Sequence, residues 1–271
     1  MFSRRLFTLL LVLGLRPVQA DPGLPPELPR GVHCAWREAA PGEAHLLMLP
    51  GWRVQPDWAW HWLQAVSAAL PPAWSAGTRC VLRGPNDARF LQRDDLDLAA
   101  WAEALRTTLP SGPVRLIAHS SGSFVAHRLL RLLAGSPEGT ALLGRIHYVN
   151  LDGAVGEGDL ALDAALIARL ASVQAVAAAD GMGESANAAA MRALLALAPD
   201  RVQFTQLDGR DAGCAPGARW CLHMLPITRR PHRPEGFDLA RDYGAIGPAH
   251  PVQVDYLRAR PITAAPPASA R

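Results

Sequence analysis

Residues 114–135, with the sequence VRLIAHSSGSFVAHRLLRLLAG, place a serine between a strand pattern and a helix pattern. An apolar run typical of a buried strand stops at 118–122 (AHSSG), and apolar residues then resume at helical spacing. A tight turn between a strand and a helix brings the residues two before and two after its centre into close backbone contact. Ala118 and Gly122 are small enough for those two positions. We therefore predict that Ser120 sits on a tight strand-to-helix turn, with an ordinary connection as the alternative.

Strand and helix patterns alternate along the rest of the chain. Strand patterns lie at 32–36, 45–49, 78–82, 114–118, 146–151 and 202–207. Helical patterns lie at 57–70, 96–109, 121–134, 160–179 and 188–198. Such alternation predicts an α/β fold with a mostly parallel sheet and helices on both faces.

The first twenty residues, MFSRRLFTLLLVLGLRPVQA, have the pattern of an export signal. A basic start precedes an apolar stretch that is short for a membrane span, and small residues close it at Val18-Gln19-Ala20. Arg4 and Arg5 also fit the twin-arginine variant, so both that route and the general secretory route stay open. An uncleaved membrane anchor is the alternative.

Charge does not indicate a polyanionic partner. Of the 27 basic residues, Arg4, Arg5 and Arg16 lie in the signal, which leaves 24 against 24 acidic residues. Nucleic acids and anionic membranes are bound by clustered basic side chains. We expect neither as a partner, and no stable membrane anchor after cleavage. Residues 21–260 are long enough for one α/β domain, and we expect 261–271 to be a disordered tail.

The chain has four cysteines, an even number that favours two disulfides in an exported protein. We expect Cys34 to pair with Cys80 and Cys214 with Cys221. A zinc site is the alternative, but Cys34 and Cys80 lack the close paired spacing of zinc ligands.

A serine hydroxyl becomes a nucleophile when an imidazole takes its proton and a carboxylate orients that imidazole. In strand-to-helix serine turns of this kind the acid and then the histidine follow along the chain. Asp152 and Asp208 each close a strand pattern after the turn, so both are candidates. His223 follows the last strong strand, beside Cys221, whereas His250 and the more remote His232 are alternatives. The other histidines lie in predicted strands or helices or within the turn.

Three segments resemble pancreatic-type lipases of the α/β-hydrolase superfamily. LIAHSSG is similar to their LIGHSLG turn, VNLDGA to their GLDPA segment, and residues 221–224 (CLHM) to their Cys-Asn-His-Leu segment. The resemblance spans about Gly112 to Met224 and implies an α/β-hydrolase fold. It also implies Ser120 as nucleophile, Asp152 as acid and His223 as base, with Asp208 structural. Most α/β-hydrolases place the acid after a later strand, so Asp208 remains the alternative.

Acyl transfer also needs two backbone N–H groups that hold the oxyanion of the tetrahedral intermediate. Ser121 follows the predicted nucleophile, and residues 49–52 (LPGW) occupy the place of the His-Gly-aromatic loop of lipases. We predict the N–H groups of Trp52 and Ser121 as the oxyanion hole; a plain strand-ending turn is the alternative for 49–52. The neighbouring tryptophans 58, 60 and 62 fit either an acyl site or the core.

One departure from these lipases limits what the resemblance implies. Only six residues separate Cys214 from Cys221, too few for a surface-opening lid, so triglyceride specificity does not carry over. The helical patterns between 160 and 198 fit either a cap or helices that cover the sheet. The signal pattern and the resemblance together predict an exported serine esterase, without cofactor or metal, acting on a small-molecule or lipid ester. Acyl transfer, amide hydrolysis and an inactive binding protein on the same fold are the alternatives.

Overall fold

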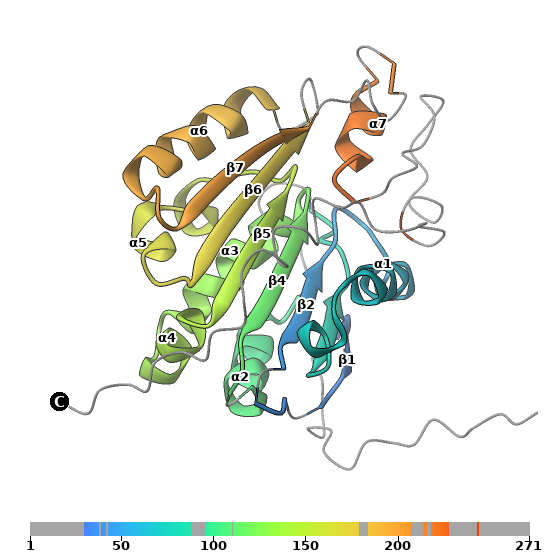
Figure 1. Cartoon of the computed structure of the whole chain (residues 1–271), viewed down its shortest axis with the longest axis vertical. Helices are drawn as coiled ribbons and strands as arrows, with labels where there is room; N and C mark the ends of the chain where they lie inside the picture. The colour runs from blue at the N-terminus through green and yellow to red at the C-terminus, as the bar shows by residue number, and fades with distance from the viewer. Residues whose placement is uncertain are drawn as a thin grey trace, which may run out of the picture.

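The chain folds around one central β-sheet (Figure 1). The computed structural model describes residues 30–37, 39–41, 43–87, 96–109, 111–178, 184–207, 214–215, 218–227 and 243, with only the backbone at 184–187. The predicted signal at 1–20 and the predicted tail at 261–271 lie outside these residues, as do Asp208, His232 and His250.

Within the described residues the sheet has seven strands in the order β1-β3-β2-β4-β5-β6-β7. The strands are β1 (Val32–Ala35), β2 (His45–Leu49), β3 (Arg79–Leu82), β4 (Val114–His119), β5 (Ile146–Leu151), β6 (Ser172–Ala178) and β7 (Val202–Leu207). β1 is antiparallel to β3, and every other neighbouring pair is parallel. The predicted mostly parallel sheet is confirmed, and the carboxyl ends of β2, β4, β5 and β6 share one edge.

The central strands are buried on both faces. Every residue of β2, β4 and β6 is buried, as expected for strands of a sheet that is covered on both faces. Successive side chains of a strand point to opposite faces. Leu46 and Met48 accordingly enter one hydrophobic cluster, while Leu47 and Leu49 enter the other.

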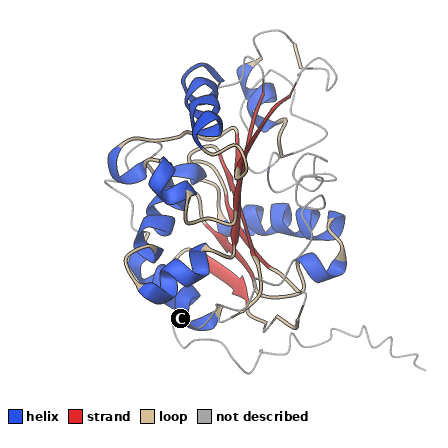
Figure 2. Cartoon of the chain, turned by 60° about the vertical axis from the view of Figure 1, so that its left-hand side comes forward, coloured by secondary structure: helices blue, strands red, loops and turns tan. Residues whose placement is uncertain are grey.

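Helices cover both faces of the sheet, which Figure 2 shows nearly edge-on. The α-helices are α1 (Pro56–Ala69), α2 (Leu98–Thr108), α3 (Gly122–Leu133), α4 (Pro137–Leu143), α5 (Ala164–Ile167), α6 (Glu184–Leu197) and α7 (Arg219–Met224). Trp62 of α1 and Met224 of α7 pack on one face. Trp101 of α2, Leu129 of α3 and Met191 of α6 pack on the other. The chain has the predicted α/β-hydrolase fold.

The prediction of one long helix at 160–179 is wrong. The structure has the short helix α5 and then β6, which reads SVQAVAA. Alanine favours helices, but β6 is hydrogen-bonded to β5 on one side and β7 on the other, and this pairing outweighs local propensity. Because β6 lies inside the sheet, this segment does not form a cap. Helix α6 packs against β6 and β7, as a sheet-covering helix does.

Helix α4 was not predicted, although its start has a clear sequence signal. The Ser136 hydroxyl accepts a hydrogen bond from the Gly139 N–H at 3.0 Å, and Pro137 occupies the first helical position. A capping serine followed by proline is typical of a helix start. The helix is short, and its few apolar residues gave little periodicity to detect.

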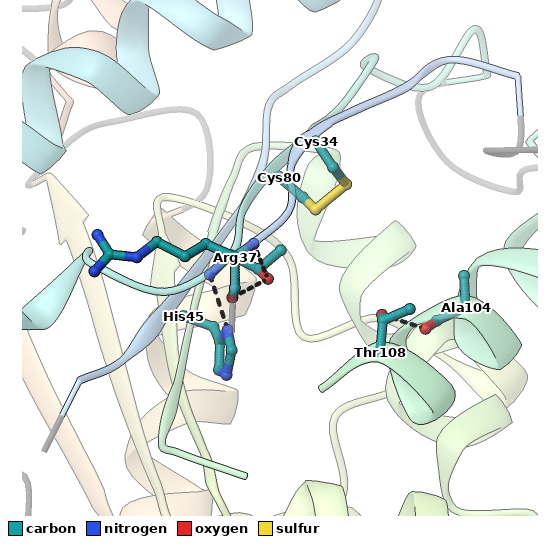
Figure 3. The surroundings of a disulfide bond; sticks show 7 residues. Cys34, Arg37, His45, Cys80, Ala104 and Thr108 are labelled. Carbon is teal, nitrogen blue, oxygen red and sulfur yellow. Dashed lines mark hydrogen bonds between the residues drawn. A yellow bond between two sulfur atoms is a disulfide. The ribbon is translucent and has the colours of Figure 1, made fainter. Parts of the chain in front are cut away.

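Both predicted disulfides are confirmed. Cys34–Cys80 joins directly opposed positions of β1 and β3 (Figure 3), and Cys214–Cys221 lies next to His223. Disulfides are typical of proteins that mature outside the reducing cytosol, so the bridges are compatible with export. Among the described helices, none is long and apolar enough to cross a bilayer.

A buried histidine–tyrosine pair lies in the core on the α3 face. His127 of α3 donates from Nδ1 to the Leu160 carbonyl at 2.8 Å, and the Tyr148 hydroxyl donates to Nε2 at 3.0 Å. Burial lowers the pKa of His127 to about 4; the charge of Arg131 also lowers it, and Asp163 partly opposes this. His127 is therefore neutral at neutral pH.

We expect His127 to make the fold sensitive to acid. Its pKa is near 6.5 in the unfolded chain and about 4 in the folded one, so between these values the unfolded state binds more protons. The free energy of unfolding should fall as the pH falls through this range, by about 3 kcal/mol. Denaturant titrations of wild type and His127→Gln test this, because the other histidines contribute equally to both. The variant should be less stable at neutral pH and less pH-dependent; equal pH slopes would contradict the assignment.

Candidate active site

Ser120 lies on the turn between β4 and α3, as predicted. Its φ of 55° is in the left-handed region, and its carbonyl accepts hydrogen bonds from the N–H and hydroxyl of Ser123 at 3.0 and 2.8 Å. A Cβ atom on Gly122 would lie 2.3 Å from the Leu49 carbonyl oxygen and 2.5 Å from that of Pro50. Glycine is therefore required at 122, where α3 begins against the loop after β2.

Backbone strain concentrates at the carboxyl edge of the sheet. Among the described residues other than glycine, those with positive φ are Arg53 (57°), Ser120 (55°) and Asp152 (45°). Arg53 lies in the loop after β2, Ser120 directly follows β4 and Asp152 directly follows β5. Such residues cost about 1–3 kcal/mol each and cluster at functional sites. Their shared edge is where the candidate residues meet.

Asp152 and His223 form a buried pair although they are 71 residues apart. His223 Nδ1 donates to Asp152 Oδ2 at 2.5 Å, and the two side chains are 6% and 0% exposed. The Asp152 N–H donates to the Val176 carbonyl at 2.6 Å, and the Ala178 N–H reaches Asp152 Oδ1 at 3.4 Å. The carboxylate is thus fixed between β5 and β6, facing the imidazole.

His223 lies on the short helix α7, which the sequence patterns did not predict. The helix is anchored on one side by the Cys214–Cys221 disulfide, which packs with Leu222 in a small hydrophobic cluster. On the other side Met224 packs against the α1 face of the sheet. The imidazole is therefore held by its helix as well as by Asp152.

The loop after β2 lies against the serine. A Cβ atom on Gly51 would be 2.9 Å from Ser120 Cβ and 3.3 Å from Ser120 Oγ. The Gly51 carbonyl accepts a hydrogen bond from the Val54 N–H at 3.3 Å, and the Trp52 indole donates to the Asn86 carbonyl at 2.7 Å. These bonds fix the loop beside the hydroxyl.

The residues that directly follow Gly51 and Ser120 carry the two backbone N–H groups predicted to form the oxyanion hole. Within the part of the chain that the structure describes, neither the Trp52 N–H nor the Ser121 N–H donates a hydrogen bond to protein. In a trans peptide the N–H points away from the preceding carbonyl. Because the Gly51 carbonyl faces Val54, the Trp52 N–H points away from Val54. Unpaired N–H groups beside a serine can bind an anionic oxygen.

His119 and Tyr243 complete the surroundings, and no sequence pattern indicated a role for either. The Tyr243 hydroxyl contacts His119 Nδ1, and His119 Nε2 lies 2.8 Å from the His223 carbonyl. Burial, together with the neighbouring charge of His223, holds the pKa of His119 well below its ordinary value. No sequence pattern could have linked Tyr243 to His119, which lies 124 residues earlier.

The tryptophans have different surroundings. Trp62 is fully buried and packs edge-on against Tyr243 with ring centroids 5.6 Å apart, so it belongs to the core. Trp58 and Trp60 are partly buried against the same core. Trp52 is half-buried, and the ring of Trp220, which is 36% exposed, lies 6.0 Å from that of His223. Apolar surface therefore flanks the site at Trp52 and Trp220.

The described residues show no hydrogen bond between Ser120 Oγ and His223. Hydrogen bonds of this kind are often long in the absence of substrate. His119 connects the two residues, because it precedes Ser120 and its ring centroid lies 4.6 Å from that of His223. In the same part of the chain, no group of three His, Cys, Asp or Glu residues is placed to hold a metal ion.

Comparisons with known proteins find several hydrolases among solved structures, all at low sequence identity. No protein-family model matches the chain. No curated protein matches it. A solved structure from Xanthomonas campestris pv. campestris, assigned to the α/β hydrolase superfamily, has 22% identity and a TM-score of 0.41, covering 62% of this chain and 88% of its own. Lipase B of Aspergillus fumigatus has 13% identity and a TM-score of 0.41, with 83% and 62% covered. Carboxylesterase CesB of Bacillus subtilis has 11% identity and a TM-score of 0.39, with 65% and 79% covered.

Proposed function

We propose that this chain is an exported serine hydrolase that cleaves carboxylic esters through an acyl-enzyme. The proposal is carried by the buried hydrogen bond between His223 Nδ1 and Asp152 Oδ2, at the edge where Ser120 follows β4. A buried aspartate that accepts from one imidazole nitrogen leaves the other free to take a proton and stabilises the imidazolium. This is the arrangement that an adjacent serine needs to become a nucleophile.

In the proposed reaction Ser120 Oγ attacks the ester carbonyl carbon while its proton passes to His223 Nε2. The oxyanion that forms is held by the N–H groups of Trp52 and Ser121. Collapse breaks the bond to the alcohol oxygen, which leaves with the proton from His223. Water then attacks the acyl-enzyme, again giving its proton to His223, and the carboxylic acid is released as Ser120 Oγ regains a proton.

The apolar surface at Trp52 and Trp220 supports an ester with an apolar or aromatic group, either a small molecule or a lipid. Export is proposed by way of the signal at 1–20, and the two disulfides support a destination outside the reducing cytosol. The reaction requires no cofactor.

Covalent labelling tests the proposal directly. A fluorophosphonate probe should phosphonylate Ser120 Oγ in the folded, oxidised protein, with loss of fluoride, and mass spectrometry should place the adduct on that residue. Ser120→Ala should not be labelled. Ser136→Ala is the matched control, because it removes a hydroxyl at the start of α4 and should label like wild type. An unlabelled wild type that also leaves a panel of chromogenic esters of increasing acyl length intact would rule out the enzyme.

A further inference from the structure

We infer that the buried residues His119 and Tyr243 form one hydrogen-bonded bridge. This bridge positions both the loop after β2, which carries the Trp52 N–H, and the catalytic histidine His223. This inference rests on the proposed function. The pair contacts neither substrate nor the reacting atoms in the proposed reaction, so both are positioning residues.

The bridge runs from the loop after β2 to helix α7. The Gly51 N–H donates to the Tyr243 hydroxyl oxygen at 3.1 Å, and the same hydroxyl contacts His119 Nδ1. His119 Nε2 lies 2.8 Å from the His223 carbonyl oxygen. Tyr243 and His119 are each 1% exposed. Both ring nitrogens of His119 therefore have partners, and water does not compete for them.

The direction of each hydrogen bond follows from the donors and acceptors available. A carbonyl oxygen can only accept, so His119 Nε2 carries the proton that points at His223. His119 is neutral because burial disfavours its charged form, so Nδ1 is an acceptor. Tyr243 must then donate its hydroxyl proton to Nδ1 while its oxygen accepts from Gly51. The bridge has one consistent set of proton positions, which makes it rigid.

Both ends of the bridge reach groups of the proposed reaction. Gly51 is held at its N–H by Tyr243 and at its carbonyl by the Val54 N–H. The bond at the carbonyl orients the peptide that carries the Trp52 N–H, and the bond from Tyr243 orients the peptide directly before it. The His223 carbonyl belongs to the last turn of α7 and has no backbone donor among the described residues; His119 supplies one. Loosening the bridge should therefore misalign the oxyanion donor and the base together.

Tyr243→Phe tests the inference, because it removes only the hydroxyl. The matched control is Tyr148→Phe, which removes the same kind of buried tyrosine–histidine hydrogen bond from the opposite face of the sheet. Active sites are first counted by fluorophosphonate titration, and kcat and KM for a chromogenic ester are then measured per titrated site. We expect Tyr243→Phe to lower kcat about 10-fold or more, with KM within about 3-fold, as for a misplaced oxyanion donor. Tyr148→Phe should lower the thermal midpoint to a similar extent but keep kcat within about 2-fold.

The outcomes separate the two proposals. A wild type that neither labels nor turns over esters would overturn the proposed function, and this inference with it. The inference alone would be overturned if Tyr243→Phe is labelled and has the wild-type kcat per titrated site. It would also be overturned if Tyr148→Phe loses as much kcat as Tyr243→Phe. If Tyr243→Phe does not fold, His119→Gln and His119→Asn are measured instead. The amide side chain of each variant can replace only one of the two ring nitrogens of His119. Both should lose kcat per titrated site, and wild-type kcat in both would overturn the bridge.

Discussion

Replacing Ser120 by alanine is expected to abolish ester turnover while leaving the fold intact. Loss of the nucleophile removes the acyl-enzyme route altogether, and we expect kcat to fall roughly 10⁴-fold or more. The Ser120 hydroxyl makes no hydrogen bond to the described residues, and alanine can replace serine without added bulk, so the thermal midpoint should stay within about 3 °C of wild type. Initial rates on a chromogenic ester and a thermal melt of the same preparation measure both quantities.

Two results would contradict this assignment. Retention of a tenth or more of wild-type turnover in Ser120→Ala would show that another group carries the reaction. A large fall in the thermal midpoint would show that the loss of turnover reflects unfolding. Ser136→Ala, which alters a helix start at a distance from the site, controls for the general effect of removing a hydroxyl.

The second large effect is expected for Asp152→Asn. The neutral amide cannot stabilise the imidazolium of His223, and its NH₂ group, if turned toward Nδ1, would favour the wrong imidazole tautomer. We expect kcat to fall about 10³- to 10⁴-fold. Because Asn has the same size as Asp, the Asp152 contacts with β6 need little rearrangement, and circular dichroism should show a folded protein.

Asp208→Asn is the matched comparison, since it makes the same chemical change at the other acid that the sequence analysis left open. It should retain most of the wild-type rate. Equal rates for the two variants, measured per folded protein, would remove the assignment of Asp152.

The elements that the sequence predicted correctly are those with one strong local pattern. Strands β2, β4 and β5 are short, mostly apolar segments, and the small residues around Ser120 are required by a tight turn; both were found. β6 was mistaken for helix because alanine carries little information about burial, and its strand geometry comes from its neighbours β5 and β7. Local composition could not reveal a pairing that depends on residues 25 or more positions away.

Within the candidate site, the sequence predicted which residues take part but not which groups they contact. It named Asp152 and His223 through a family resemblance while leaving Asp208 open, because distance along the chain does not determine which carboxylate meets the imidazole. His119 was seen only as part of the turn. Its role depends on Tyr243 and the His223 carbonyl, and that arrangement exists only once His119 has packed against residues more than 100 positions later in the chain.

The left-handed backbone at Ser120 and Asp152 has an evolutionary consequence. Glycine at either position would relax an unfavourable conformation, so selection for thermal stability alone would favour glycine there. Such a variant would lack the nucleophile or the acid of the proposed reaction. Under the proposed function, a lineage that keeps serine and aspartate on such backbone is one in which selection for activity has outweighed selection for stability at those two positions.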